Sequence, residues 1–318
     1  MEIMFQTIGK CNLNCWFCGY NFLDKDRLDR YNKMYMSLNT FKEYVRKCID
    51  FGFDEFQLTP VIGEPLLDPS FMEKIEYLHR FESLKRVSFF TNFININEPK
   101  LKRLLFDFPK LTMTISIYGL DRETYEETTD VDVFERFETN IKTLSKLYRP
   151  SSIPIEFFVR CPWNGIKSKL KSLITILSCA KPFDTDYYKR NNLAFLNWNG
   201  NWCGLVSDNT FPNQRKDHHR EGICWYALID NSIDPAGDIT LCGATDILKK
   251  TVIGNINRQS LEEIYSEDSL YANCYIKAQH RNFYAGCCEK CSDHHIPDQK
   301  SLKEYSGRYK WLEKLISK

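Results

Sequence analysis

The 318-residue chain lacks an excess of charge of either sign, because 43 lysines and arginines are balanced by 42 aspartates and glutamates. Such a balance provides no overall field to attract nucleic acid or an anionic lipid surface, so neither is expected as a partner. No stretch approaches the roughly 20 apolar residues that cross a bilayer. The N-terminus also lacks the basic and apolar segments of a secretory signal. We therefore expect a cytoplasmic protein.

Internal repeats and low-complexity tracts are absent as well, whereas cysteine is plentiful, with thirteen residues. In a large chain without a signal peptide, these thiols are expected to stay reduced for metal binding or chemistry. Cys11, Cys15 and Cys18 lie within eight positions, and no fourth ligand is nearby. A structural zinc site needs four ligands, and core packing does not favour such crowding. A [4Fe–4S] cluster held by three thiolates explains the deficit, because one iron is left open for another ligand.

Short β-rich runs alternate with helical patterns over the first two thirds of the chain. The expected strands are residues 3–8, 55–59, 86–91, 111–117, 153–159 and 193–198, and the expected helices are 37–52, 68–81, 98–108, 132–148 and 167–180. Hydrophobic strands that are each followed by a crossover helix imply a parallel sheet covered by helices. The fold class is therefore α/β, with a partial (β/α)6 TIM-like barrel. Its chemistry should lie at the carboxyl ends of the strands.

The alternation stops near residue 200, which divides the chain into three parts. Residues 1–200 form the barrel, 201–222 a linker or lid, and 223–318 a small cysteine-rich domain with a C-terminal helix. The pattern of residues 232–243 predicts a hairpin with Gly237 at its turn. Four cysteines of this region can complete a tetrahedral set of thiolates: Cys224, Cys242, Cys288 and Cys291. Zinc is the alternative occupant, Cys287 is an alternative ligand to Cys288, and Cys274 has no assigned role.

The first cysteine group also carries a resemblance to a known family. Cys11, Cys15, Phe17 and Cys18 match the pattern CxxxCxφC, with an aromatic at φ, and the chain resembles the radical S-adenosylmethionine (SAM) superfamily. The resemblance implies that SAM binds the open iron through its amino and carboxylate groups. It also implies that an electron from the cluster cleaves SAM to methionine and a 5′-deoxyadenosyl radical, which takes a hydrogen atom from a substrate.

Further segments extend the resemblance over residues 3–198. Gly63 and Glu64 in "VIGEP" match the family's GGEP segment, which binds the SAM amino group, although Ile62 replaces the first glycine. Asn92 in "FFTNF" lies where the third strand usually ends in TNG. Ser116 begins a segment similar to SxDG, with Tyr118 in place of aspartate. Arg160, at the end of the fifth expected strand, is a candidate partner for the SAM carboxylate.

The C-terminal region resembles the auxiliary-cluster domains called SPASM and twitch. Its hairpin spacing is Cx12Gx4C from Cys224 to Cys242, and a CxxC pair follows at Cys288 and Cys291. The full SPASM pattern continues with more cysteines, whereas none follows Cys291 here. The resemblance therefore implies one auxiliary [4Fe–4S] cluster in addition to the SAM-binding cluster.

A fully ligated auxiliary cluster favours a net oxidation, because it can accept an electron but has no site left for the substrate. We expect a dehydrogenation of a small polar, sugar- or cyclitol-like substrate, with a flavodoxin- or ferredoxin-like protein as electron donor. One alternative is an epimerase in which Cys203, expected at the barrel mouth, returns the hydrogen atom. Another is a maturase that modifies a peptide substrate. An iron–sulfur electron-transfer protein is the non-enzyme alternative, but it would not need Glu64 or the SAM-binding segments.

Overall fold

The computed structural model describes residues 1–119, 121–160, 193–195, 200–207, 210 and 220–317. Nine strands of this part form a single sheet in the order β6-β5-β4-β3-β2-β1-β7-β8-β9. The strands are β1 (Glu2–Phe5), β2 (Glu55–Gln57), β3 (Arg86–Thr91), β4 (Leu111–Ile117), β5 (Ile155–Val159), β6 (Leu193–Phe195), β7 (Ser232–Ile233), β8 (Asp238–Thr240) and β9 (Val252–Asn255). All pairings from β6 to β7 are parallel, and those of β8 are antiparallel. The six-stranded partial barrel predicted from the sequence is confirmed.

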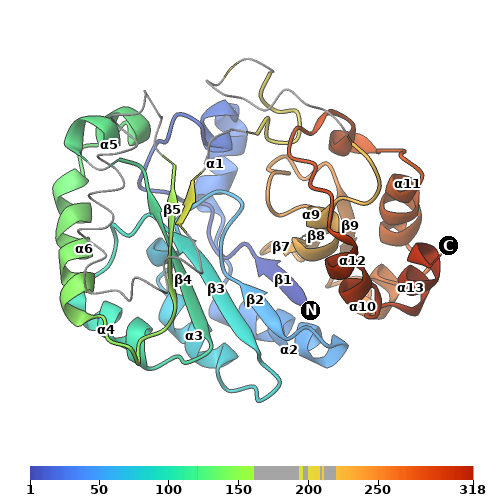
Figure 1. Cartoon of the computed structure of the whole chain (residues 1–318), viewed down its shortest axis with the longest axis horizontal. Helices are drawn as coiled ribbons and strands as arrows, with labels where there is room; N and C mark the ends of the chain where they lie inside the picture. Colours follow the sequence, from blue (N-terminus) through green and yellow to red (C-terminus); the bar gives the residue numbers. More distant parts are fainter. Residues whose placement is uncertain (120, 161–192, 196–199, 208–209, 211–219, 318) are drawn as a thin grey trace.

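Helices cover the outer face of the parallel strands, as Figure 1 shows. The helices of the N-terminal part are η1 (Gly19–Phe22), α1 (Lys25–Lys33), α2 (Leu38–Phe51), η2 (Pro65–Leu67), α3 (Phe71–Leu78), α4 (Glu98–Phe106), α5 (Arg122–Thr129) and α6 (Phe134–Leu147), of which η1 and η2 are short turns in the loops after β1 and β2. The C-terminal part has α9 (Trp225–Ile229), α10 (Leu261–Ile264), η3 (Tyr271–Ile276), α11 (Lys277–His280), η4 (Gly286–Lys290), α12 (Gln299–Ser306) and α13 (Lys310–Ile316). Two helices, α12 and α13, thus end the chain where one was predicted.

The local sequence explains why the predicted helices form. The Ser37 side chain accepts a hydrogen bond from the Thr40 backbone and begins α2, and Gly52 ends it with φ at 109°. By contrast, α1 was not predicted, because it has no apolar period and buries only Tyr31. The predicted helix 167–180 and the end of the predicted strand 193–198 lie outside the described residues.

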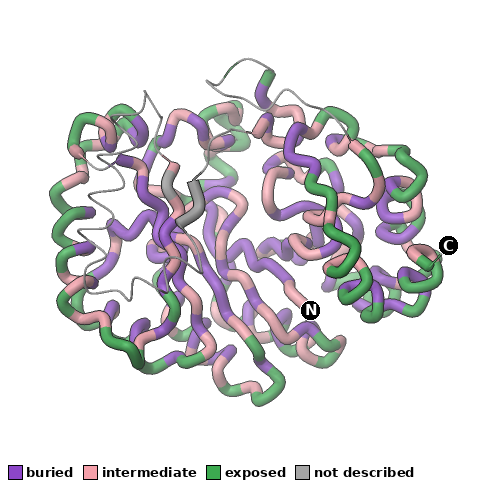
Figure 2. Tube along the Cα trace, in the orientation of Figure 1, coloured by how far each residue is buried: buried purple, intermediate pink, exposed green. Residues whose placement is uncertain are grey.

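The C-terminal part does not form a separate sheet. Strand β7 pairs in parallel with β1, with Met4 beside Ser232 and Phe5 beside Ile233. The β7–β8 hairpin therefore extends the barrel sheet, and Gly237 lies at its turn with φ at 86°. Figure 2 shows the strands as a buried layer with exposed helix surfaces around it. One hydrophobic core runs through both parts, from Ile3 to Leu312.

No helix within the described ranges is long and apolar enough to cross a membrane.

Candidate active site

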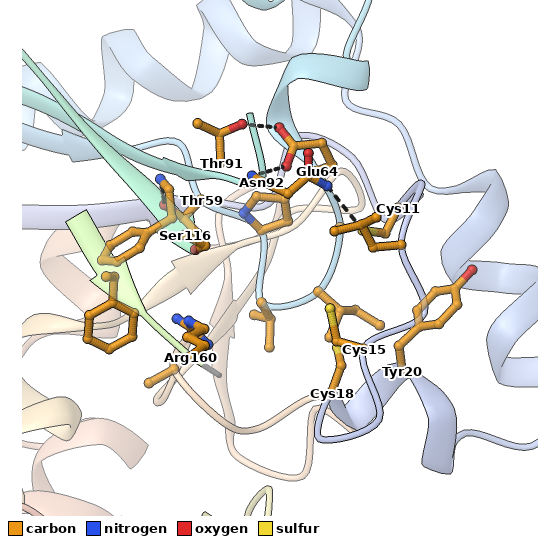
Figure 3. A pocket seen from close by; sticks show the side chains of 18 of the residues that line it. Cys11, Cys15, Cys18, Tyr20, Thr59, Glu64, Thr91, Asn92, Ser116 and Arg160 are labelled. Carbon is orange, nitrogen blue, oxygen red and sulfur yellow. Dashed lines mark hydrogen bonds between the residues drawn. The ribbon is translucent and has the colours of Figure 1, made fainter. Parts of the chain in front are cut away.

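The three N-terminal cysteines lie in the loop that follows β1, where the sequence predicted them. Cys11, Cys15 and Cys18 all line a cavity of about 350 Å³ (Figure 3). The loop is fixed from behind, because the backbone N–H groups of Asn14 and Trp16 donate to carbonyls at the end of α5. Helix α5, which the sequence did not reveal, therefore positions the cysteine loop.

The spacing of these sulfurs argues against a single metal ion. Tetrahedral zinc, with Zn–S bonds near 2.3 Å, needs sulfurs only about 3.8 Å apart. Among the described residues, neither cysteine group brings three sulfurs within 4.8 Å of one another. Burial raises the pKa of Cys11 to about 12, and burial, reinforced by the neighbouring thiols, raises the pKa of Cys15 well above its usual range. Three neighbouring thiolates are thus not favoured without cations, which an iron–sulfur cluster supplies.

The Gly63–Glu64 turn is tied directly to the cysteine loop. The Glu64 N–H donates to the Lys10 carbonyl at 2.9 Å. Gly63 has φ at 132°, and a Cβ there would lie 2.7 Å from the Ile8 carbonyl oxygen, so no other residue fits. This close approach of two backbones explains why the glycine is retained although Ile62 departs from the family segment.

The Glu64 carboxylate is buried and holds the end of β3. It accepts hydrogen bonds from the Leu66 backbone at 3.0 Å, the Thr91 hydroxyl at 2.6 Å and the Asn92 backbone at 2.8 Å. Burial nevertheless outweighs these donors and raises the pKa of Glu64 to about 7. Glu64 therefore organises the cavity wall that it also lines.

Asn92 and Ser116 reach the cavity from the ends of β3 and β4, as predicted. The Asn92 amide donates to the Asn12 side chain at 2.7 Å and lies 4.0 Å from the Cys11 sulfur. Asn92 thus contacts the cysteine loop itself, on the side of Cys11 that Figure 3 shows facing Glu64.

Arg160 and Phe17 complete the predicted set of cofactor-binding residues. Both line the cavity, and the Arg160 guanidinium lies over the Phe158 ring at 4.5 Å. Within the described part of the chain, the buried Arg160 Nε has no hydrogen-bond partner. Phe17 packs against Tyr118, with ring centroids 6.2 Å apart. Tyr118, which replaces the family's aspartate, also lines the cavity.

The four C-terminal cysteines come together in a second, much smaller cavity of about 20 Å³. It is lined by Cys224 at the start of α9, Cys242 after β8, and Cys288 and Cys291 at η4. Burial, reinforced by neighbouring thiols, raises the pKa of Cys242 well above its usual range and that of Cys288 to about 12. The structure thus brings together the ligand set that the spacing predicted.

Cys203 and Cys287 are joined to each other by a disulfide. Cys203 lines the smaller cavity and not the larger one, so its sulfur faces the C-terminal cysteines and carries no hydrogen atom to donate. Cys287 is likewise bonded, and Cys288 is the residue of this pair that lines the smaller cavity. The nearby Asp246 completes no metal site, because its oxygens already accept from Lys250 and Thr251.

Trp202, Tyr226 and Asp230 are among the cavity residues that escaped sequence reasoning. Tyr226 lines both cavities, so the two cavities adjoin at this residue. Both Tyr226 and Asp230 lie between Cys224 and the hairpin, a segment in which no local pattern marks a cavity residue. Only the pairing of β7 with β1 brings them to the barrel.

The site combines an open three-cysteine loop after β1, a cavity of about 350 Å³ and a second cysteine group on a parallel partial barrel. This combination is typical of a cluster-dependent barrel enzyme. Comparison with known families identifies the family within this class of enzyme. Residues 5–155 match the radical SAM superfamily, and residues 224–292 match the SPASM iron–sulfur cluster-binding domain. The chain belongs to the radical SAM superfamily and carries a SPASM domain.

Among characterised proteins, the chain is similar to GTP 3′,8-cyclase of Aquifex aeolicus (strain VF5), with 31% identity over 147 residues. That match covers 44% of this chain and 42% of the cyclase, so the chain spans less than half the length of this relative.

Solved structures with the same fold include Streptococcus suis SuiB bound to the precursor peptide SuiA, with a TM-score of 0.60 over 86% of this chain and 66% of SuiB. BtrN in complex with AdoMet and 2-DOIA has a TM-score of 0.53, over 91% of this chain and 92% of BtrN. Native anSMEcpe with bound AdoMet has a TM-score of 0.55, over 88% of this chain and 84% of anSMEcpe. Each is 16% identical to this chain, which establishes a shared fold.

Proposed function

We propose that this protein oxidises a small polar, sugar- or cyclitol-like substrate by dehydrogenation. The observation that carries the proposal is that Tyr226 lines both the large cavity and the small four-cysteine cavity. A redox centre held by four thiolates at the small cavity would lie within one side chain of a substrate in the large one. Since four thiolates leave no position for the substrate, such a centre is suited to accept an electron.

The residues of the large cavity fit a SAM-binding cluster. Cys11, Cys15 and Cys18 would hold a [4Fe–4S] cluster, and the unpartnered Nε of Arg160 offers a donor to the SAM carboxylate. Supporting contacts would come from Phe17, Gly63, Glu64, Asn92 and Ser116, which line the same cavity. When bound, these groups supply the 5′-deoxyadenosyl radical that removes a hydrogen atom from the substrate.

The residues of the small cavity, Cys224, Cys242, Cys288 and Cys291, would hold a second [4Fe–4S] cluster. The wide spacing of the sulfurs supports a cluster over zinc. The proposal also includes an electron donor of flavodoxin or ferredoxin type and a cytoplasmic location. It divides the chain into a barrel, a linker and an auxiliary domain, with the boundaries at residues 200 and 223. In this division residues 201–206 are not a free linker, since Asn201, Trp202 and Cys203 bond to both cysteine regions.

Peptide maturation is the second candidate, because similar folds include SuiB bound to a precursor peptide and anSMEcpe bound to peptides. The size of the cavity favours the small substrate: at about 350 Å³ it lies at the low end of ligand pockets, and SAM must share it. Epimerisation with Cys203 as hydrogen donor is disfavoured by the disulfide. The cyclase activity of the Aquifex relative has little support, because less than half of each chain is shared.

The test is a reaction in deuterium oxide. Anaerobically reconstituted protein, SAM and dithionite are incubated with candidate polyols, aminocyclitols and peptides. Dehydrogenation predicts substrate-dependent 5′-deoxyadenosine and a product two hydrogens poorer than its substrate, with no carbon-bound deuterium. A stereoinverted product carrying one solvent deuterium would replace this proposal by epimerisation, and a modified peptide would replace it by maturation.

A further inference from the structure

Asp230 reaches the large cavity from the C-terminal part of the chain. It follows α9 and precedes β7, whose pairing with β1 places this residue beside the barrel strands. The cavity wall around it consists of Met4, Gln57, Tyr226, Gly243 and Ala244. These residues lie on strands β1 and β2 and in the SPASM domain, whereas Cys11, Glu64 and Arg160 follow the strand ends. Asp230 therefore lines a different part of the cavity from the proposed SAM site.

The carboxylate of Asp230 has no protein partner. Its backbone is engaged, since its N–H donates to Tyr226 at 3.0 Å and its carbonyl accepts from Gly243 at 2.5 Å. Over the residues that the structure describes, however, no donor or cation contacts the side-chain oxygens. Four buried carboxylates elsewhere are engaged by protein donors: Glu64 by Leu66, Thr91 and Asn92, Asp68 by Ser70 and Lys74, Asp234 by Ala236, Asp238 and Lys249, and Asp246 by Lys250 and Thr251.

An unpartnered carboxylate next to apolar groups is costly to the fold. Burial, together with Glu2, raises the pKa of Asp230 to about 7, which reflects this cost. A group that destabilises the free protein is typical of a binding site, where the missing partner arrives with the ligand. Glu2 does not fill that role, because it is itself anionic and already paired with Arg86.

We propose that Asp230 is a substrate-binding residue that selects a substrate carrying a protonated amine. An ammonium group compensates a buried carboxylate with both charge and hydrogen bonds. The inference rests on the proposed function for the position of the substrate in this cavity, and it narrows the substrate class to amines. An amino sugar or aminocyclitol and a lysine-bearing peptide are the two sources of such a group.

The first test needs no substrate. Asp230→Asn is compared with Asp234→Asn in thermal unfolding of the purified protein at pH 8. Asp234 accepts from two backbone N–H groups and Lys249, so its replacement should lower the melting temperature. Asp230→Asn should raise it, because a charge without a partner is removed. A fall comparable with that of Asp234→Asn would show that Asp230 has a structural role and would overturn the proposal.

The second test measures binding by saturation-transfer NMR on reconstituted protein with SAM. Glucosamine is paired with glucose, and the peptide Gly-Lys-Gly with Gly-Gln-Gly. Wild-type protein should bind one amine about tenfold more tightly than its uncharged counterpart, as one charge-assisted hydrogen bond predicts. Asp230→Asn should abolish this preference, whereas Asp234→Asn, at a carboxylate that does not line the cavity, should keep it. The pair that shows the preference identifies the source of the amine.

Equal binding of both members in each pair, or a preference that survives in Asp230→Asn, overturns the proposal. Failure of the proposed function is a separate result: it appears as wild-type protein that forms no dehydrogenated product, whatever its preference for amines.

Discussion

The indole Nε1 of Trp202 donates a hydrogen bond of 2.9 Å to the carbonyl oxygen of Phe17, between two cysteines of the N-terminal loop. Asn201, the preceding residue, donates to the Lys290 carbonyl and accepts from the Ser292 N–H, on either side of Cys291. Cys203, the following residue, is bonded to Cys287. Three consecutive residues thus connect the two cysteine regions, so a change at one region can reach the other through this segment.

Trp202→Phe removes the indole N–H and reduces the bicyclic ring that packs against Gly19 to a single ring. We expect a loss of about 1 kcal/mol in the free energy of unfolding for the hydrogen bond, and a further loss for the smaller ring that Trp311→Phe shares. We also expect weaker SAM binding by calorimetry, because Phe17 and Cys18 lose their anchor. Trp311→Phe is the matched control, since its indole donates to the Tyr265 carbonyl at 3.1 Å, away from both cavities. Equal SAM affinities of the two variants would contradict the anchoring role.

Metal analysis distinguishes the two cysteine groups. Reconstituted wild-type protein should hold about eight irons and eight sulfides, as two [4Fe–4S] clusters require. Replacing Cys11, Cys15 and Cys18 together by alanine should halve this content and abolish SAM cleavage. Replacing Cys288 and Cys291 should also halve it but leave the SAM-binding cluster. Four irons with bound zinc in the wild type would establish zinc at the C-terminal site.

Gly63→Ala should damage the site through the backbone. With φ at 132° and a Cβ 2.7 Å from the Ile8 carbonyl, alanine must displace the turn that carries Glu64. We expect a destabilisation of about 1–3 kcal/mol in chemical unfolding and a large loss of SAM affinity. Gly222→Ala separates conformational strain from crowding, because Gly222 has φ at 66° and no atom within 4 Å of a Cβ. It should keep SAM affinity, and a similar loss there would refute the argument.

Glu64 should make stability fall as pH rises. Its pKa is raised from 4.5 to about 7 in the folded protein, mainly by burial. Between these values the folded state holds a proton that the unfolded state has released, so stability is full below pH 4.5 and is lost through pH 7. The loss amounts to about 3 kcal/mol. Unfolding of cluster-free Glu64→Gln should lack this part of the pH dependence, whereas the exposed-surface variant Glu127→Gln should retain it.

Much of the fold and of the SAM-binding site was predictable, because those signals are local. Strands β3 and β4 have the predicted bounds, since each is rich in the β-branched, aromatic and other apolar residues that favour strands. The cysteine positions could be predicted from their spacing, and Gly63 from the match of its segment to the family's GGEP. Trp202 and Asp230 could not be predicted, because their positions depend on contacts between segments far apart in the sequence. Trp202 bonds to Phe17, and Asp230 reaches the cavity through the pairing of β7 with β1, in each case across more than 180 residues. Helix α1 was missed because its surface is almost entirely polar.

The disulfide between Cys203 and Cys287 leads to the last prediction, which concerns the hydrogen atom taken from the substrate. An epimerase must return a hydrogen atom to the substrate radical, and a thiol at the barrel mouth could do so. Cys203 instead lines the smaller cavity, and its sulfur is bonded to Cys287. Cys203→Ala should therefore still form product, and product made in deuterium oxide should gain no carbon-bound deuterium.

Cys287→Ala is the control for this experiment, because it leaves Cys203 with a free thiol. If the thiol of Cys203 were a hydrogen donor, Cys287→Ala would form stereoinverted product carrying one solvent deuterium, and Cys203→Ala would form none. If the pair only connects the barrel mouth to the auxiliary site, the two variants should behave alike. Both should then lose a similar amount of stability, about 2–4 kcal/mol for a disulfide, because each breaks the same bond.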